Sequence, residues 1–215
     1  MSLWNKVRPH HKMYSREVTT QLGLKASASM TVRTAIEMTL YDLVCQHAAA
    51  AEAACNSGNH KEELSSSIQT IILAAACMEA FINQEAIRML GPEFYRYDRG
   101  CIDVHCKPLT QKRGYPSLED KWCEITERVS NKQFDKGKQP FQGFHELVEL
   151  RNEVLHYKGI SAQPVPSPWQ DVQGSVTSER AKFTAAVAQD VVKSMRGMLQ
   201  KFHTLCGKQL PEWIK

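Results

Sequence analysis

Apolar side chains recur at helical spacing along most of this chain. Between residues 32 and 48 an apolar side chain stands at every fourth position, which places these side chains on one face of a helix. No segment shows the apolar–polar alternation of a strand, so the pattern indicates an all-α fold, an up-and-down bundle of about five helices. The helices are expected over residues 32–56, 61–90, 117–129, 140–157 and 177–206.

Three segments interrupt the helical pattern. Residues 1–31 are polar and lack periodicity, and we expect an irregular lead-in before a bundle over 32–215. Residues 91–116 combine glycine, proline, aromatic and basic residues and are typical of an elaborated loop inserted into the bundle. A proline-rich connector over 161–175 precedes the last helix. Ser117 and Asp120 have the spacing of a capping box, which marks the start of the third helix.

Composition narrows the class of protein. The 215 residues are 42% hydrophobic and 23% charged, which is enough for one sizeable core. The net charge of +4 permits an acidic partner such as nucleic acid. No apolar run approaches the roughly 20 residues of a membrane span, and the polar, basic N-terminus lacks the apolar core of a signal peptide. The seven cysteines include no CxxC pair, so we expect reduced thiols and a cytoplasmic location. Because no apolar run is long enough for a span, we expect no membrane partner.

Two charged residues occupy positions where the helical pattern calls for apolar ones. Arg151 follows Phe144 and Val148 in the fourth helix, and Glu79 follows Ile72 in the second. An unpaired buried charge costs several kcal/mol, so the two side chains are expected to pair across the bundle, with Glu79 orienting the Arg151 guanidinium. Two other interpretations stay open. The pair could be purely structural, or the helices could be rotated so that both groups reach solvent.

A histidine lies near the end of the same helix. His156 follows Arg151 by five positions, about 140° around a straight helix, so the two side chains share no face of one copy. They could meet if the helix ended between them or if a second molecule supplied its own pair. With Gly159 as the C-cap, His156 could instead be a capping histidine without a chemical role.

The string ELRNEVLHYKG resembles the R-N-x-x-x-H signature of the HEPN superfamily, through Arg151, Asn152 and His156. The stretches CMEAFIN (77–83) and DKW (120–122) also resemble the preceding helices of bacterial HEPN-type proteins. The looser pattern of Arg and His alone also occurs at Arg99–His105 and Arg196–His203, but neither has an Asn after its Arg.

The resemblance implies a compact helical bundle, dimeric, with a composite site, acting without metal or cofactor as an endoribonuclease. Such proteins occur in bacterial defence and toxin–antitoxin systems, so an antitoxin or a nucleotidyltransferase is an expected partner. Other members of the family have lost catalysis, and the alternative function is therefore a module that binds RNA, a nucleotide or a protein. A helical bundle that carries the motif by coincidence is a third possibility.

If the chain is an enzyme, RNA supplies its own nucleophile, the 2′-hydroxyl. His156, with an unperturbed pKa of about 6.5, suits proton transfer, and Arg151 suits a phosphate because its planar fork stays charged. Asn152 would bind the phosphate or orient the imidazole, and Glu79 would support Arg151. Tyr157 and Lys158 could contact RNA by stacking and charge, or be ordinary surface residues. The expected products are a 2′,3′-cyclic phosphate and a 5′-hydroxyl.

A metal site is the weaker possibility. The string CIDVHC (101–106) gathers two cysteines, a histidine and an aspartate, but the spacing fits no standard zinc motif and no second ligand pair follows. A loop with buried thiols is the simpler expectation. The sequence contains neither a P-loop nor a GxGxxG motif. We therefore expect no metal and no nucleotide cofactor.

Overall fold

The computed structural model describes residues 14–19, 25–30, 36–111, 114–155 and 182–214. The chain divides into two compact units, Met1–Ala35 and Ile36–Lys215, and each is described separately. The larger unit is mostly helical over its described residues and contains no strand there, which confirms the expected all-α class. Its helices are α1 (Ile36–Asn56), α2 (His60–Leu90), α3 (Phe94–Asp98), α4 (Leu118–Ser130), α5 (Phe141–Leu155) and α7 (Ala185–Leu205), with short 3₁₀ turns at Gly91–Glu93 and Glu212–Ile214.

The smaller unit contains a β-hairpin where we expected no regular structure. Strand β1 (Tyr14–Thr19) pairs antiparallel with β2 (Lys25–Met30), so that Tyr14 lies opposite Met30 and Thr19 opposite Lys25. The second strand does alternate along its sequence, KASASM, but between alanine and serine. Because these two side chains differ little in polarity, the alternation carries almost no hydrophobic signal.

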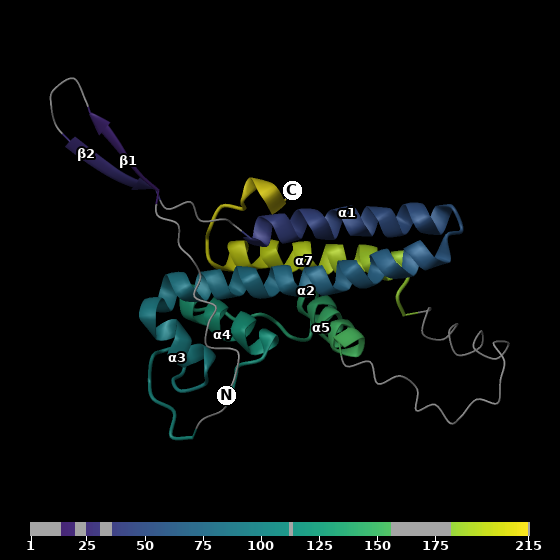
Figure 1. Cartoon of the computed structure of the whole chain (residues 1–215). Coiled ribbons are helices and arrows are strands. Elements are labelled where there is room, and N and C mark those ends of the chain that lie inside the picture. The colour runs from purple at the N-terminus through teal and green to yellow at the C-terminus, as the bar shows by residue number, and fades with distance from the viewer. Residues whose placement is uncertain (1–13, 20–24, 31–35, 112–113, 156–181, 215) are drawn as a thin grey trace, which may run out of the picture. The chain divides into compact units, whose positions relative to one another are not determined.

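The larger unit is built around the α1–α2 hairpin. The two helices run side by side and α7 packs against both, while α4 and α5 pack on α2 and α7 (Figure 1). A tight turn joins α1 to α2, because Gly58 adopts a positive φ of 71° and the Asn59 side chain accepts the Glu62 amide at 3.3 Å. The position of α5 across α2 and α7 sets where its C-terminal end emerges from the bundle.

Capping interactions at the helix ends determine where the helices begin. The predicted capping box of α4 is present, with the Ser117 hydroxyl accepting the Asp120 amide at 3.1 Å. The last helix begins at Ala185 rather than at the expected 177; residues 182–184 are not helical, and 177–181 lie outside the described residues. Thr184 caps this start, and the Glu63 carboxylate of α2 accepts the Ala185 amide at 3.0 Å. That contact lowers the pKa of Glu63.

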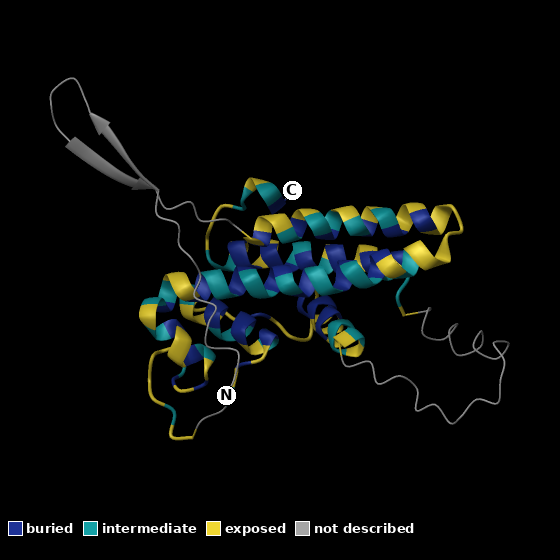
Figure 2. Cartoon of the chain, viewed as in Figure 1, coloured by how far each residue is buried: buried dark blue, intermediate teal, exposed yellow. Residues whose placement is uncertain are grey.

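The core centres on Trp122 of α4, which is fully buried. Figure 2 shows in dark blue the buried residues of the helices. Its indole stacks on Phe81 of α2 at 5.6 Å between ring centroids. It also contacts Phe144 of α5 and Phe202 of α7, each at 5.8 Å. One side chain thus joins four helices, and burial of such aromatic surface is the main contribution to holding them together.

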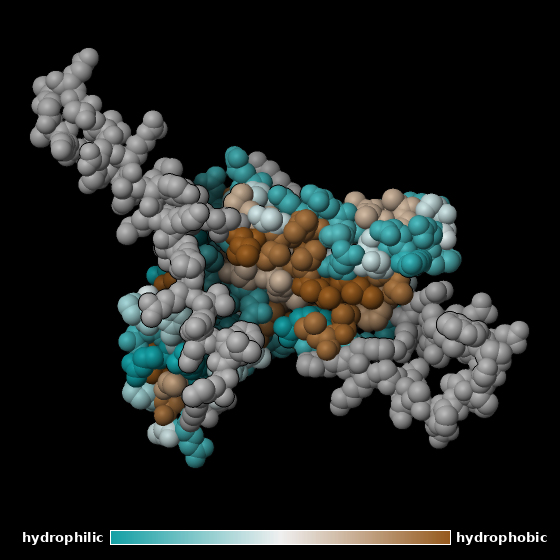
Figure 3. Space-filling model, in the orientation of Figure 1, coloured by the Kyte–Doolittle hydropathy of each residue, from teal (hydrophilic) through white to brown (hydrophobic). Residues whose placement is uncertain are grey.

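One face of α2 is apolar yet only half-buried. It carries Ile68, Ile72, Ala76, Ala80 and Ile87, and apolar side chains line α2 in Figure 3. Residues 60–98 are therefore long and apolar enough to cross a membrane, with a mean hydropathy of 1.5 over 18 residues. However, 56% of that window is buried inside the bundle, and the core helix of a bundle has the same length and composition.

Helices α5 and α7 cross closely at small residues. A Cβ added to Gly143 of α5 would lie 2.2 Å from Oγ and 3.0 Å from Cβ of Ser194 in α7. A Cβ on Gly197 of α7 would lie 3.0 Å from the Cβ of Pro140. These glycines let the two backbones approach, and this approach fixes the path of α5 toward its exposed end.

Gly143→Ala is expected to destabilise the bundle by about 1–3 kcal/mol, because the new methyl group overlaps Ser194. Chemical denaturation, read as the change in the free energy of unfolding, measures this effect. Gly137→Ala is the matched control, since its added Cβ would meet only the Asp135 carboxylate, at 3.4 Å. An equal loss of stability in both variants would contradict the assignment of Gly143 to the helix crossing.

A buried histidine lies near the C-terminal end of α7, among aromatic rings. His203 is 7% exposed, and both its ring nitrogens are shielded and unpaired within the described chain. Its ring lies 5.8 Å from Phe81 and from Phe202. Burial lowers the pKa of His203; Lys208 and Arg88 reinforce this effect, while Glu85 and the backbone of Gln209 oppose it. Folding therefore favours the neutral imidazole over the charged form.

The free energy of unfolding should fall as the pH decreases below about 6.5, because the unfolded chain then binds a proton that folded His203 does not. His203→Phe is expected to flatten this decline between pH 7 and 5 in denaturation curves. His145→Gln should act with the opposite sign and weakly. The exposed His145 hydrogen-bonds Glu119, and this contact raises its pKa and stabilises the fold at low pH. An unchanged slope in His203→Phe would contradict the burial effect.

Candidate functional site

The R-N-x-x-x-H motif lies where α5 leaves the core. The first half of α5 buries Phe141, Phe144, Leu147 and Val148. Beyond Val148 the burial decreases, and Leu155 is 58% exposed. We expected Arg151 to continue the buried row; instead the last turn emerges from the bundle, and Arg151 is half-buried at the boundary with solvent.

Arg151 is held by its neighbour in the motif. Its Nη2 donates to Oδ1 of Asn152 at 2.9 Å, which fixes the plane of the guanidinium. Its Nε is shielded from solvent and has no hydrogen-bond partner among the described residues. A buried donor left unpaired costs about 1–3 kcal/mol. The guanidinium is thus partly oriented and retains unused hydrogen-bonding capacity, which an incoming anion could satisfy if the side chain shifts.

The expected pairing of Glu79 with Arg151 is not formed. Glu79 is half-buried, and no ion pair joins the two within the described chain. The row of α2 that faces the core contains Ile71, Met78 and Glu85, at intervals of seven. Because Glu79 follows Met78 by one residue, its side chain points about 100° away from this row. It points toward the partly exposed apolar face of α2 that carries Ile72 and Ala76.

The buried carboxylate of α2 is Glu85, which sequence reasoning missed. It is 4% exposed and accepts a hydrogen bond from Lys208 at 2.6 Å and another from Arg88. Both cations are partly exposed, so the cluster binds the segment after α7 to α2 at the surface. Glu85 follows Ile71 and Met78 at intervals of seven residues and therefore lies on the same face of α2. The sequence would have indicated its burial only if this face had been identified as the one toward the core.

The remaining motif residues extend past the described part of α5. His156, Tyr157 and Lys158 lie outside the described residues, so the structure brings together only Arg151 and Asn152 of the predicted site. Glu153, within the motif, forms an ion pair with Lys182 at 3.1 Å. This pair joins the last turn of α5 to the residues just before α7. Both side chains are about half exposed, so its contribution to stability is small.

The two other Arg–His pairs do not form sites. Arg196 of α7 donates from Nε to the hydroxyl of Tyr41 at 2.9 Å, while His203 is buried among Phe81 and Phe202. Arg99 and His105 are exposed on either side of a short turn. Neither pair combines an oriented cation with an accessible imidazole, which leaves the α5 motif as the candidate.

The CIDVHC loop is organised by hydrogen bonds to its aspartate. Oδ1 of Asp103 accepts the amides of His105 and Lys107, both at 2.8 Å. Cys101 and Cys106 are exposed, contrary to the expectation of buried thiols. Among the residues that the structure describes, no group of three or more histidine, cysteine, aspartate or glutamate side chains could hold a metal ion. The aspartate is occupied in shaping the turn.

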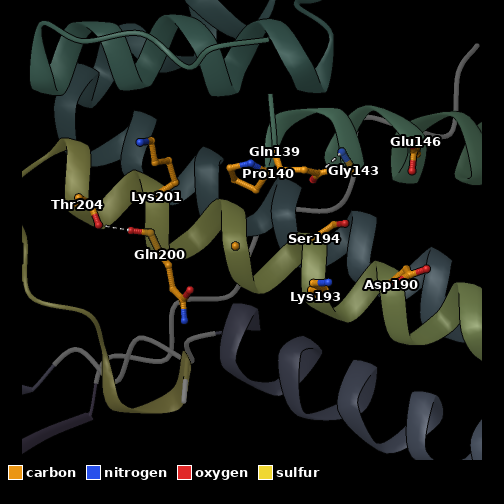
Figure 4. A pocket seen from close by; sticks show the side chains of 11 residues that line it. Gln139, Pro140, Gly143, Glu146, Asp190, Lys193, Ser194, Gln200, Lys201 and Thr204 are labelled. Atoms are coloured by element: carbon orange, nitrogen blue, oxygen red, sulfur yellow. Dashed lines mark hydrogen bonds between the residues drawn. The ribbon is translucent and has the colours of Figure 1, made fainter. Parts of the chain in front are cut away.

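A polar groove lies between the start of α5 and one face of α7. It encloses about 700 Å³, with Lys201 and Thr204 at one end and Glu146 and Asp190 at the other (Figure 4). Its lining contains no histidine or cysteine, and neither Arg151 nor Asn152 contributes to it. The lysines and carboxylates balance, so the groove has no charge preference for phosphate. The groove therefore offers weaker support for catalysis than the end of α5.

Comparisons of this chain with family models, with curated proteins and with solved structures give no match.

Proposed function

We propose that this chain is a metal-independent endoribonuclease with a HEPN-like bundle and a site formed by Arg151, Asn152 and His156. The observation that carries the proposal is the hydrogen bond from Arg151 to Asn152 at the emerging end of α5. It supports Arg151 as an oriented cation beside solvent. The motif places His156 one residue after the last described residue of this helix.

Each residue of the proposed site has a role that suits the chemistry of its side chain. His156 transfers a proton, either from the 2′-hydroxyl or to the 5′-oxygen leaving group. Arg151 stabilises the negative charge that develops on the phosphorane, and the Asn152 side chain holds the guanidinium in place. The 2′-oxygen attacks the adjacent phosphorus, the bond to the 5′-oxygen breaks, and a 2′,3′-cyclic phosphate remains.

A homodimer completes the proposed site. The five-residue spacing directs Arg151 and His156 about 140° apart on one helix. Two copies meeting at the ends of their α5 helices would place an arginine of one copy near a histidine of the other. Tyr157 and Lys158 are proposed RNA contacts beside this cleft, and Glu79, which does not contact Arg151, has no role in it.

The test is incubation of the purified chain with mixed RNA in the presence of EDTA. We expect cleavage, because none of the proposed steps uses a metal ion. RNA that stays intact under these conditions, while the protein is folded and dimeric, would favour the alternative of a HEPN module that only binds RNA, a nucleotide or a nucleotidyltransferase partner.

A further inference from the structure

Two tyrosines in the inserted loop are far more exposed than the other aromatic residues of the described chain. Tyr95 of α3 is 67% exposed and Tyr115 is 73% exposed. Within residues 91–111 and 114–116, no other large hydrophobic side chain is exposed to this degree.

The fold places these tyrosines on either side of an arginine. The Arg99 amide donates to the Tyr95 carbonyl at 3.2 Å, so Arg99 lies one helical turn after Tyr95. The next residue, Gly100, has a positive φ of 65°, and a Cβ there would lie 1.9 Å from the carbonyl oxygen of Gly114. This close approach of the two glycines brings the backbone that carries Tyr115 near the backbone that carries Arg99.

The backbone beneath this surface is fixed. The Tyr95 ring packs edge-on against the buried ring of Phe94, with 5.6 Å between centroids. Two further hydrogen bonds close the turn, from the Gly100 amide to Tyr97 at 2.8 Å and from the Cys101 amide to Arg96 at 2.9 Å. The Tyr95 ring and Arg99 therefore project from an ordered turn, which lowers the entropic cost of binding.

Two of the nearby carboxylates are neutralised by ion pairs with residues other than Arg99. Asp98 pairs with buried Lys121 at 2.6 Å, and Glu93 pairs with Arg96 at 2.7 Å. Asp103 accepts two backbone amides. Arg99 is exposed and forms no ion pair with any residue that the structure describes. Its guanidinium remains available for a phosphate or for stacking on a base.

We infer that Tyr95, Arg99 and Tyr115 form a binding surface for single-stranded nucleic acid, separate from the end of α5. Successive bases stack on the two tyrosine rings, and Arg99 contacts the intervening phosphate. In Figure 1, α3 lies at the C-terminal end of α2, apart from the end of α5. The surface would thus hold RNA at a distance from the proposed cleavage site. The choice of RNA rather than single-stranded DNA as the ligand rests on the proposed function; the surface itself does not.

The test measures the affinity of the His156→Ala protein for a short fluorescein-labelled single-stranded RNA by fluorescence anisotropy. Tyr95→Ala and Tyr115→Ala should each weaken binding about 5- to 100-fold, since each removes one stacking ring. Tyr95→Phe and Tyr115→Phe should bind as the parent does. Arg99→Ala should also weaken binding, and the slope of the logarithm of affinity against the logarithm of salt concentration should fall by about one, as for the loss of one phosphate contact. Arg128→Ala, at an exposed arginine of α4, is the control and should change neither quantity.

Affinities unchanged by both tyrosine-to-alanine substitutions would overturn the inference, as would equally tight binding of duplex RNA that depends on the same rings. Binding of anionic lipid vesicles in place of RNA, lost in the same variants, would also overturn it. The outcome is independent of catalysis. A chain that binds RNA through these tyrosines but leaves it uncut contradicts the proposed function and not this surface.

Discussion

His156→Ala is expected to reduce RNA cleavage by a factor of roughly 10²–10⁴, the usual contribution of general acid–base catalysis. Alanine removes the only group of the proposed site that can transfer a proton near neutral pH. Initial rates on a defined single-stranded RNA measure the effect. His156→Gln should be equally inactive, because an amide keeps the polarity of the side chain without its titration.

The His156 variants need a control for folding and binding. His156→Ala should keep the helical circular dichroism and the RNA affinity of the parent protein, since its effect is on proton transfer. His47→Ala replaces a half-buried histidine of α1 outside the motif and should retain full activity. Cleavage by His156→Ala at the parental rate would remove the histidine from the mechanism.

Arg151→Ala is expected to lower the cleavage rate by roughly 10²–10³, because it removes the charge proposed to stabilise the transition state. Arg151→Lys should recover only part of the rate, since an ammonium keeps the charge but lacks the planar fork that donates in pairs. Asn152→Ala should fall between the parent and Arg151→Ala, because it frees the guanidinium held at 2.9 Å.

Mixing the two inactive proteins distinguishes a shared site from a site within one copy. If each cleft takes its arginine from one subunit and its histidine from the other, Arg151→Ala mixed with His156→Ala forms some clefts with both residues intact. Activity should reappear after the mixture is allowed to exchange subunits. A mixture as inactive as its components, with exchange verified by light scattering of tagged subunits, would contradict the composite site.

Local chemistry made the helices predictable. The helical spacing of apolar residues placed α1, α2 and α5 within a few residues of their observed bounds, and Ser117 with Asp120 formed the predicted capping box. The start of α7 was wrong by eight residues, because a carboxylate distant in sequence, Glu63, helps Thr184 to cap it at Ala185. Such a tertiary contact has no signature in the local pattern.

The rotation of α2 was harder to predict than its position. Apolar residues cover most of its circumference, so Ile68 and Ile72 suggested a core row that contains Glu79. Ala75, Ile82 and Ala86 of that row are buried, but the centre of the buried face lies on the side of Met78 and Glu85, and Glu79 lies at its edge. A helix that is apolar nearly all round gives no unique face, and its orientation is set by packing against α1, α7 and Trp122. The buried carboxylate was consequently assigned to the wrong residue.

The central claim is that this chain cleaves RNA by attack of the 2′-hydroxyl, and the ends of the products test it most directly. A defined RNA is incubated with the protein in EDTA, and the fragments are weighed by mass spectrometry. We expect paired fragments that end in a 2′,3′-cyclic phosphate and begin with a 5′-hydroxyl, and no cut where the attacking nucleotide is 2′-deoxy. Fragments with 5′-phosphate ends, or cleavage that persists at the 2′-deoxy position, would contradict it.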